Sequence, residues 1–106
     1  MGVEEGLIRE IVRGVLSAAR AKRIILFGSA ATGTMSRDSD IDLLVLEDQP
    51  DNRIQESVRI RRAIGFIAYP VDVIVMRTER FEEMKNIVGG IAFPADKYGR
   101  VIYEAA

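Results

Sequence analysis

The sequence contains no cysteine and no histidine among its 106 residues. Without cysteine it can form no disulfide, perform no thiol chemistry and hold no zinc through thiolates. Without histidine it has no serine–histidine triad, no imidazole acid–base catalysis and no histidine-ligated metal. Carboxylates, together with cations that prefer oxygen ligands such as Mg²⁺, are therefore the main catalytic resource of this sequence.

Long apolar runs and a large net charge are also missing. No run approaches the roughly 20 residues that a membrane-spanning helix needs. The acidic, amphipathic start MGVEEGLIRE fits neither a secretory signal nor a myristoylation motif. We therefore expect a soluble, cytoplasmic protein with no membrane partner. The net charge of −1 argues against general nucleic-acid binding, and the basic cluster Arg59, Arg61 and Arg62 is typical of a solvated helix face.

The length and the composition predict one domain that spans residues 1–106. Domains cluster near ~100–150 residues, which leaves too little chain for a second core. The 48% hydrophobic and 29% charged residues are normal for a globular protein.

The hydrophobic pattern alternates between helical and strand-like segments. Helical spacing predicts helices at Glu4–Arg20 and Ile54–Ala68, and a third that begins with Thr78 as its N-cap and ends near Gly89-Gly90. Short apolar runs predict strands at Arg23–Ser29, Ile41–Glu47 and Val71–Met76, and an edge strand at Arg100–Glu104. The expected fold class is α/β (α+β), a small β-sheet with helices packed against it.

Three aspartates lie at the starts of two predicted strands. Side chains alternate along a strand, so Asp40 and Asp42 point to the same side, about 7 Å apart. Asp72 is the second residue of its strand and would join them if that strand pairs with Ile41–Glu47. Singly, Asp40 could cap a turn and Asp72 could be a solvated edge residue. Together, three like charges repel one another unless a divalent cation neutralises them, so the spacing predicts a site for one or two Mg²⁺ ions.

The segment GSAATG, residues 28–33, separates the first two predicted strands. Glycine at position 28 lets the backbone approach a ligand closely, and exposed N–H groups with the Ser29 hydroxyl suit phosphate oxygens. A Gly-Ser turn by itself is most often only a turn. Beside three aspartates it favours transfer of a nucleotidyl or phosphoryl group.

The stretch LFGSAATGTMSRDSDIDLLV resembles the signature of the DNA polymerase beta-like nucleotidyltransferases, in which Gly-Ser precedes Asp-x-Asp by about ten residues. More narrowly, nearly the whole chain resembles a minimal nucleotidyltransferase (MNT), the short prokaryotic branch. The resemblance implies a polymerase beta palm-like fold with a small mixed sheet. It implies that Gly28 and Ser29 hold the triphosphate, that Asp40 and Asp42 bind Mg²⁺, and that Asp72 helps to ligate the metal and deprotonates the attacking hydroxyl.

One position departs from the family pattern. The family commonly has Gly-Ser-x-Ala-Arg-Gly, whereas this sequence has Thr32 in place of the arginine. Threonine cannot supply a guanidinium charge, although its hydroxyl can donate a hydrogen bond to a phosphate. Arg37 or Arg61 would have to compensate, and for Arg61 a solvent-facing head group is the plainer interpretation.

The resemblance implies a function as well. It points to Mg²⁺-dependent transfer of AMP from ATP to a hydroxyl of a helical HEPN-domain toxin, with this protein as the antitoxin of a toxin–antitoxin pair. The alternative is a non-catalytic antitoxin that masks its partner and has a vestigial metal site. A small-molecule or RNA-end acceptor is a third interpretation, although such relatives generally carry extra helical domains. The apolar stretch IAFPADKYGRVIYEAA would support a homodimer or the partner contact.

Overall fold

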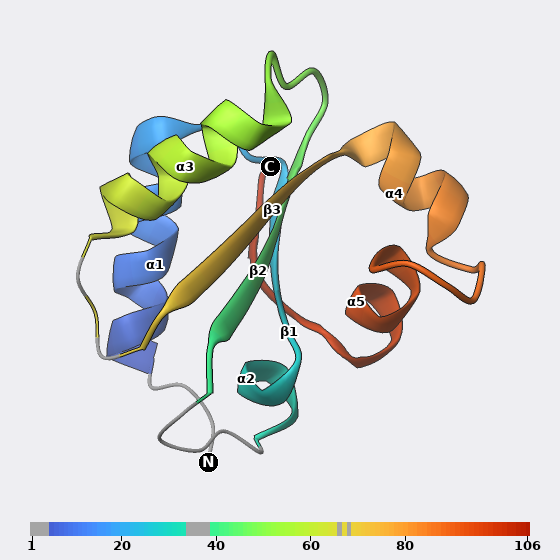
Figure 1. The fold of residues 1–106 in the computed structure, drawn as a ribbon, viewed down its shortest axis with the longest axis horizontal. Coiled ribbons are helices and arrows are strands. Elements are labelled where there is room, and N and C mark those ends of the chain that lie inside the picture. The colour runs from blue at the N-terminus through green and yellow to red at the C-terminus, as the bar shows by residue number, and fades with distance from the viewer. Residues whose placement is uncertain (1–4, 34–38, 66, 68) are drawn as a thin grey trace.

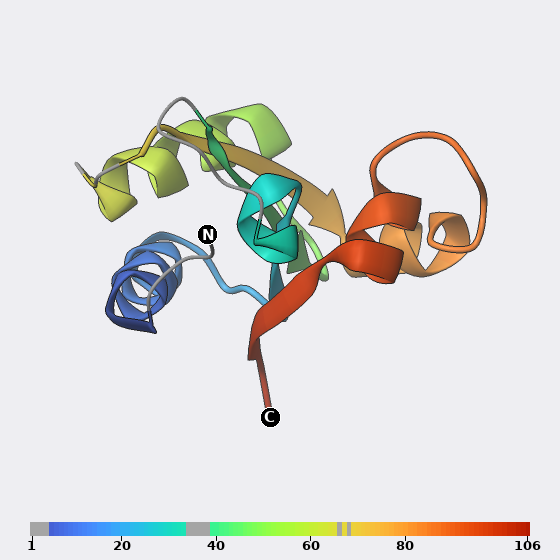
Figure 2. The same cartoon turned by 90° about the horizontal axis from the view of Figure 1, so that it is seen from below.

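The computed structural model describes residues 5–33, 39–65, 67 and 69–106. In chain order the elements are α1 (Glu5–Ala18), β1 (Arg23–Phe27), α2 (Ser29–Thr32), β2 (Ile41–Glu47), α3 (Arg53–Ile64), β3 (Val71–Arg77), α4 (Thr78–Met84), α5 (Ala92–Tyr98) and β4 (Arg100–Glu104). Figure 1 shows the sheet between two helical layers, with α1 and α3 on one side and α4 and α5 on the other. Figure 2 shows the same layers from below, with α2 at one end of the sheet.

The four strands form one mixed sheet in the order β3-β2-β1-β4. β1 pairs antiparallel with both β2 and β4, whereas β2 and β3 are parallel. A parallel pair needs a crossover connection, and α3 provides it. The mixed sheet with helices against it confirms the predicted fold class, and β4 lies at an edge as expected.

Both faces of the sheet are covered, which explains why the central strand has almost no polar residues. Alternate residues of a strand point to opposite faces. One apolar cluster packs against α1 and α3, and its sheet residues include Ile24, Leu26, Ile41, Leu43, Val45, Val73 and Val75. The other packs against α4 and α5 and includes Ile25, Leu44, Leu46, Phe81, Ala92 and Ala95. A strand buried on both sides is a nearly continuous apolar run, as IDLLVLE is.

The two helices on the first face approach each other closely. Gly14 of α1 is buried, and a Cβ atom at this position would lie 2.7 Å from the Cα of Ile64 in α3. Because backbone cannot give way as a flexible side chain can, a larger residue here would force the helices apart. Within the described residues, no helix is both long and apolar enough to cross a membrane.

Element ends differ from the sequence-based predictions in several places. Strand β2 has the predicted bounds, but β1 ends at Phe27 because Gly28 turns the chain and Ser29 begins α2. The first helix ends at Ala18, two residues before the predicted end. The second ends at Ile64, where the N–H of Gly65 closes the last turn on the Arg61 carbonyl. The predicted extension toward Ala68 includes residues 66 and 68, which lie outside the described residues.

The largest error concerns the segment after β3. The predicted N-cap Thr78 is instead the first helical residue, and its buried Oγ1 has no hydrogen-bond partner among the described residues. The helix ends at Met84, and Ile87 and Val88 are 52% and 81% exposed rather than part of an apolar stripe. A second helix, α5, follows. Pro94 lies in its first turn, where a proline costs no intrahelical hydrogen bond.

Candidate active site

Strand pairing brings two of the predicted aspartates together. Asp42 of β2 lies directly opposite Asp72 of the parallel strand β3, and adjacent strands are about 4.8 Å apart. Both residues point to the face of the sheet that α4 and α5 cover further along. Side chains two residues apart on a strand share a face, and Leu44, two residues after Asp42, belongs to the apolar cluster under α4 and α5. Asp40 immediately precedes β2 and is exposed. The predicted proximity of Asp42 and Asp72 is thus a consequence of the β2–β3 register.

The three aspartates influence one another electrostatically. Asp42 is half-buried, whereas Asp40 and Asp72 are exposed. Burial, followed by the negative charges of Asp72 and then Asp40, raises the pKa of the Asp42 carboxyl above its ordinary value. Mutual repulsion of this kind is relieved when a divalent cation binds among the carboxylates.

The carboxylates fit Mg²⁺ in their chemistry, because this ion prefers oxygen ligands. In the part of the chain that the structure describes, however, no group of three or more carboxylates is arranged to hold a metal ion together. Asp42 and Asp72 form the pair, and Asp40 is an exposed neighbour. The predicted three-carboxylate Mg²⁺ site therefore stays a prediction, which requires the exposed Asp40 side chain to turn inward.

Gly28 lies against Asp42, one member of this carboxylate pair. It has a φ of 71°, and its carbonyl accepts a hydrogen bond from the Ala31 N–H at 3.1 Å, which closes the turn into α2. A Cβ atom at position 28 would lie only 2.6 Å from Oδ2 of Asp42. Only glycine satisfies both the left-handed backbone and this close approach. The turn after β1 thus lies directly beside the start of β2.

The remaining predicted site residues have less definite positions. Ser29 and Thr32 are the first and last residues of α2, so Ser29 directly follows Gly28 and Thr32 ends the same helical turn, while their phosphate contacts stay predictions. Arg61 is exposed on α3, which covers the face of the sheet opposite Asp42. Its solvent-facing interpretation is thus confirmed. Arg37 and Asp38 lie outside the described residues.

The sequence interpretation missed a second acidic pair at the other end of β2. Glu47 and Glu56 are buried there, 6% and 5% exposed. The burial of Glu47 was predictable from the sequence, because side-chain alternation along the strand puts Glu47 on the same face as Leu43 and Val45, which are buried. For Glu56, on a weakly amphipathic helix, no sequence pattern indicates burial.

Comparison with known proteins identifies the family of the chain. Residues 8–93 match the family of nucleotidyltransferase domains. Over 47 residues the chain is 47% identical to a protein of Methanocaldococcus jannaschii described as a "putative protein adenylyltransferase". That match covers 42% of this chain and 47% of the relative, so it spans about half of the relative's length.

Solved structures show the same fold. A toxin–antitoxin crystallised with AMP-PNP superposes with a TM-score of 0.62 at 22% identity, covering 92% of this chain and 73% of the other. A "putative nucleotidyltransferase" from Sulfolobus solfataricus gives 0.61 at 24% identity, covering 93% and 78%. A mutant of the toxin–antitoxin MntA-HpeT gives 0.57 at 23% identity, covering 97% and 75%. Because the family match extends over most of the chain, this protein belongs to the nucleotidyltransferase domain family, as its motifs predicted.

Proposed function

We propose that this domain transfers AMP from ATP to a hydroxyl group of a partner protein. The observation that carries the proposal is the alignment of Asp42 with Asp72 directly beside the Gly28 turn. Two comparisons support the choice of nucleotide and acceptor. The Methanocaldococcus relative is described as acting on protein, and a structural neighbour was crystallised with AMP-PNP.

The residues of the site divide into two roles. The backbone at Gly28 and the start of α2 at Ser29 would hold the triphosphate, with Thr32 at the end of the same turn. Asp40, Asp42 and Asp72 would hold Mg²⁺. When bound, this ion would offset charge on the reacting phosphate and on the departing pyrophosphate.

The proposed transfer step is a displacement at the α-phosphorus. The acceptor hydroxyl oxygen forms a bond to that phosphorus, the bond to the bridging oxygen toward the β-phosphate breaks, and pyrophosphate leaves. Asp72 takes the hydroxyl proton. Asp72 suits this role because it is exposed on the edge strand β3, where a large acceptor can reach it, whereas Asp42 is half-buried.

We further propose that the acceptor is a helical HEPN-domain toxin and that this protein is its antitoxin. Two structural neighbours are toxin–antitoxin proteins, which supports a partner of this kind. Transfer to the toxin would silence it covalently. Masking without chemistry remains the competing function, and one experiment separates the two.

The experiment compares wild type with the double variant Asp40→Asn/Asp42→Asn. Each protein is incubated with ATP, Mg²⁺ and the co-purified partner, and intact-mass spectrometry detects the mass of one added AMP. We expect the increment with wild type and a loss of at least about 100-fold with the double variant, because both proposed metal ligands are removed. Asp96→Asn, an exposed change on α5, is the control and should transfer normally.

Two outcomes would contradict the proposal. If wild type adds no nucleotide to the partner under any nucleotide or metal, the catalytic function is wrong. If the double variant folds and still protects cells from the partner as well as wild type does, masking suffices.

A further inference from the structure

A cavity lies at the end of the sheet opposite to the candidate active site. Its volume is about 1150 Å³, and it is bordered by the end of α1, the end of β2, the first turns of α3 and the end of β4. Along β2, Glu47 at this end is five residues from Asp42, or roughly 17 Å. Glu47 also points to the other face of the sheet, the face that α1 and α3 cover. The cavity is therefore separate from the proposed nucleotide site.

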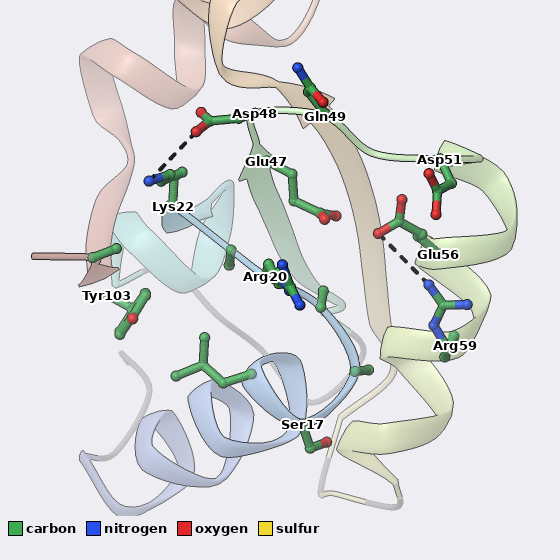
Figure 3. Close-up of a pocket in the computed structure, with 15 residues that line it drawn as sticks. Ser17, Arg20, Lys22, Glu47, Asp48, Gln49, Asp51, Glu56, Arg59 and Tyr103 are labelled. Carbon is green, nitrogen blue, oxygen red and sulfur yellow. Dashed lines mark ion pairs between the residues drawn. The ribbon is translucent and has the colours of Figure 1, made fainter.

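Two buried glutamates contribute to the wall of this cavity. Figure 3 shows the carboxyl groups of Glu47, from β2, and Glu56, from α3, directed toward each other. Each side chain is more than nine-tenths buried, and Oε2 of each has no hydrogen-bond partner among the described residues. Buried carboxylate oxygens without partners are costly. The acidic wall of the cavity therefore keeps two acceptor atoms, Oε2 of Glu47 and Oε2 of Glu56, that no donor among the described residues meets.

No charged group among the described residues donates a hydrogen bond to either Oε2 atom. Lys22 is engaged by Asp48 at 3.5 Å, and Arg59 reaches Oε1 of Glu56 at 3.8 Å (Figure 3). The other titratable or charged lining residues are Arg20, Asp51 and Tyr103.

The end of α1 also borders the cavity. Residues 16–19, at and just after the end of the helix, line the cavity, and its last turn carries no basic side chain. The carbonyl end of a helix is partially negative, so it favours a cation in the same space.

We propose that this cavity binds a ligand bearing an ammonium or guanidinium group, which donates hydrogen bonds to Glu47 and Glu56. Such a group brings positive charge and several N–H donors at once. A metal ion fits less well, because the described residues contain no group of three side chains that could ligate one. The ligand would be either a free amine or a basic side chain of a protein partner, since both present the same chemistry.

The acidic pair makes binding depend on pH. Burial raises the pKa of Glu47 to about 7, helped by the hydrogen bond with Glu56 and by the negative charge of Glu56. The charge of Arg59 lowers this pKa, and the charge of Asp51 raises it further. A cationic ligand favours both carboxylates in their ionised form, so its binding releases a proton below about pH 7, where Glu47 is protonated, and almost none at about pH 8. Affinity should therefore rise about tenfold from about pH 6 to about pH 8.

The test is calorimetric titration of the full chain with two probes at both pH values. Agmatine represents a free amine, and Nα-acetyl-arginine amide represents a basic side chain in a polypeptide. We expect a Kd of about 1 mM or tighter at about pH 8, and about tenfold weaker binding at about pH 6. Tighter binding of agmatine indicates a free amine, and equal or tighter binding of the blocked arginine indicates a partner side chain.

Matched variants decide whether the acidic pair is responsible. Glu47→Gln and, independently, Glu56→Gln should each weaken binding at least tenfold and remove its pH dependence, because one ionised oxygen is lost. Glu83→Gln, an exposed change on α4, should bind as wild type does. All three should keep nucleotidyl transfer. The proposal is overturned if neither probe binds wild type at about 10 mM, or if a folded glutamate variant binds like wild type.

Discussion

The two ends of β2 carry carboxylates in contrasting surroundings. Asp42 at one end is half-buried beside the exposed residues Asp40 and Asp72, whereas Glu47 at the other end is enclosed with Glu56 beneath α3. Burial and neighbouring negative charge raise the carboxyl pKa at both ends. An open cluster can admit a cation and a large substrate, but an enclosed pair must share a proton or receive a ligand that brings donors. The same chemical group is therefore suited to different chemistry according to its access to solvent.

The change Gly28→Ala should disrupt the open end most strongly. The added Cβ would lie 2.6 Å from Oδ2 of Asp42, at a backbone φ of 71° that favours glycine. We expect transfer to fall by at least about tenfold and the free energy of unfolding to fall by about 1–3 kcal/mol. Rates of AMP transfer and urea unfolding measure the two effects.

Gly65→Ala is the matched control for this prediction. Gly65 has a φ of 76°, but a Cβ atom added there would meet open space, with no contact inside 4 Å. The Gly65→Ala variant should lose about as much free energy of unfolding as Gly28→Ala does, and it should transfer AMP at the wild-type rate. If Gly28→Ala transfers AMP at the wild-type rate, close contact between the turn and Asp42 is not needed.

The change Glu47→Gln should alter the pH dependence of stability at the enclosed end. The pKa of Glu47 is raised from 4.5 to about 7 in the folded chain, so the folded state binds more protons than the unfolded state between these values. This contribution to stability is complete below about pH 4.5 and is lost as the pH rises through about 7. We expect a loss of about 1–3 kcal/mol between about pH 5 and about pH 8 in wild type, which Glu47→Gln should lack.

Urea unfolding at several pH values measures this loss directly. Glu83→Gln removes an equivalent charge from an exposed position on α4 and should keep the wild-type slope. An unchanged slope in Glu47→Gln would mean that this carboxyl does not hold a proton at neutral pH.

The change Thr32→Arg should have the smallest effect and should act only at the open end. It restores the guanidinium that the family commonly has at this position of the loop, which can bind phosphate oxygens in a bidentate manner. We expect the KM for ATP to fall about 2- to 10-fold. Gln55→Arg adds the same charge on an exposed part of α3 and should leave the KM unchanged. An unaltered KM in Thr32→Arg would show that Thr32 already suffices.

Sequence reasoning succeeded where one local pattern had one structural meaning. The apolar run Ile41–Glu47 is a strand because both of its faces are covered. The position of Asp72 in its own strand predicted its proximity to Asp42 only on the condition that the two strands pair, and the structure shows that they do. It failed after Met84, because Gly89-Gly90 and Pro94 indicate the end of a helix but do not exclude a new one. The proline is accommodated in the first turn of α5, which a local pattern cannot reveal.

By itself, the sequence determined the chemical resources of this protein and the order of its main elements. The lack of histidine and cysteine left carboxylates, and the spacing of Gly28, Asp40 and Asp42 placed them after a turn and before a buried strand. Only the tertiary structure decided which carboxylates meet. The parallel register sets Asp72 opposite Asp42, and the packing of α3 on the sheet encloses Glu56 with Glu47. Burial and proximity of this kind depend on residues distant in sequence, so local periodicity does not contain them.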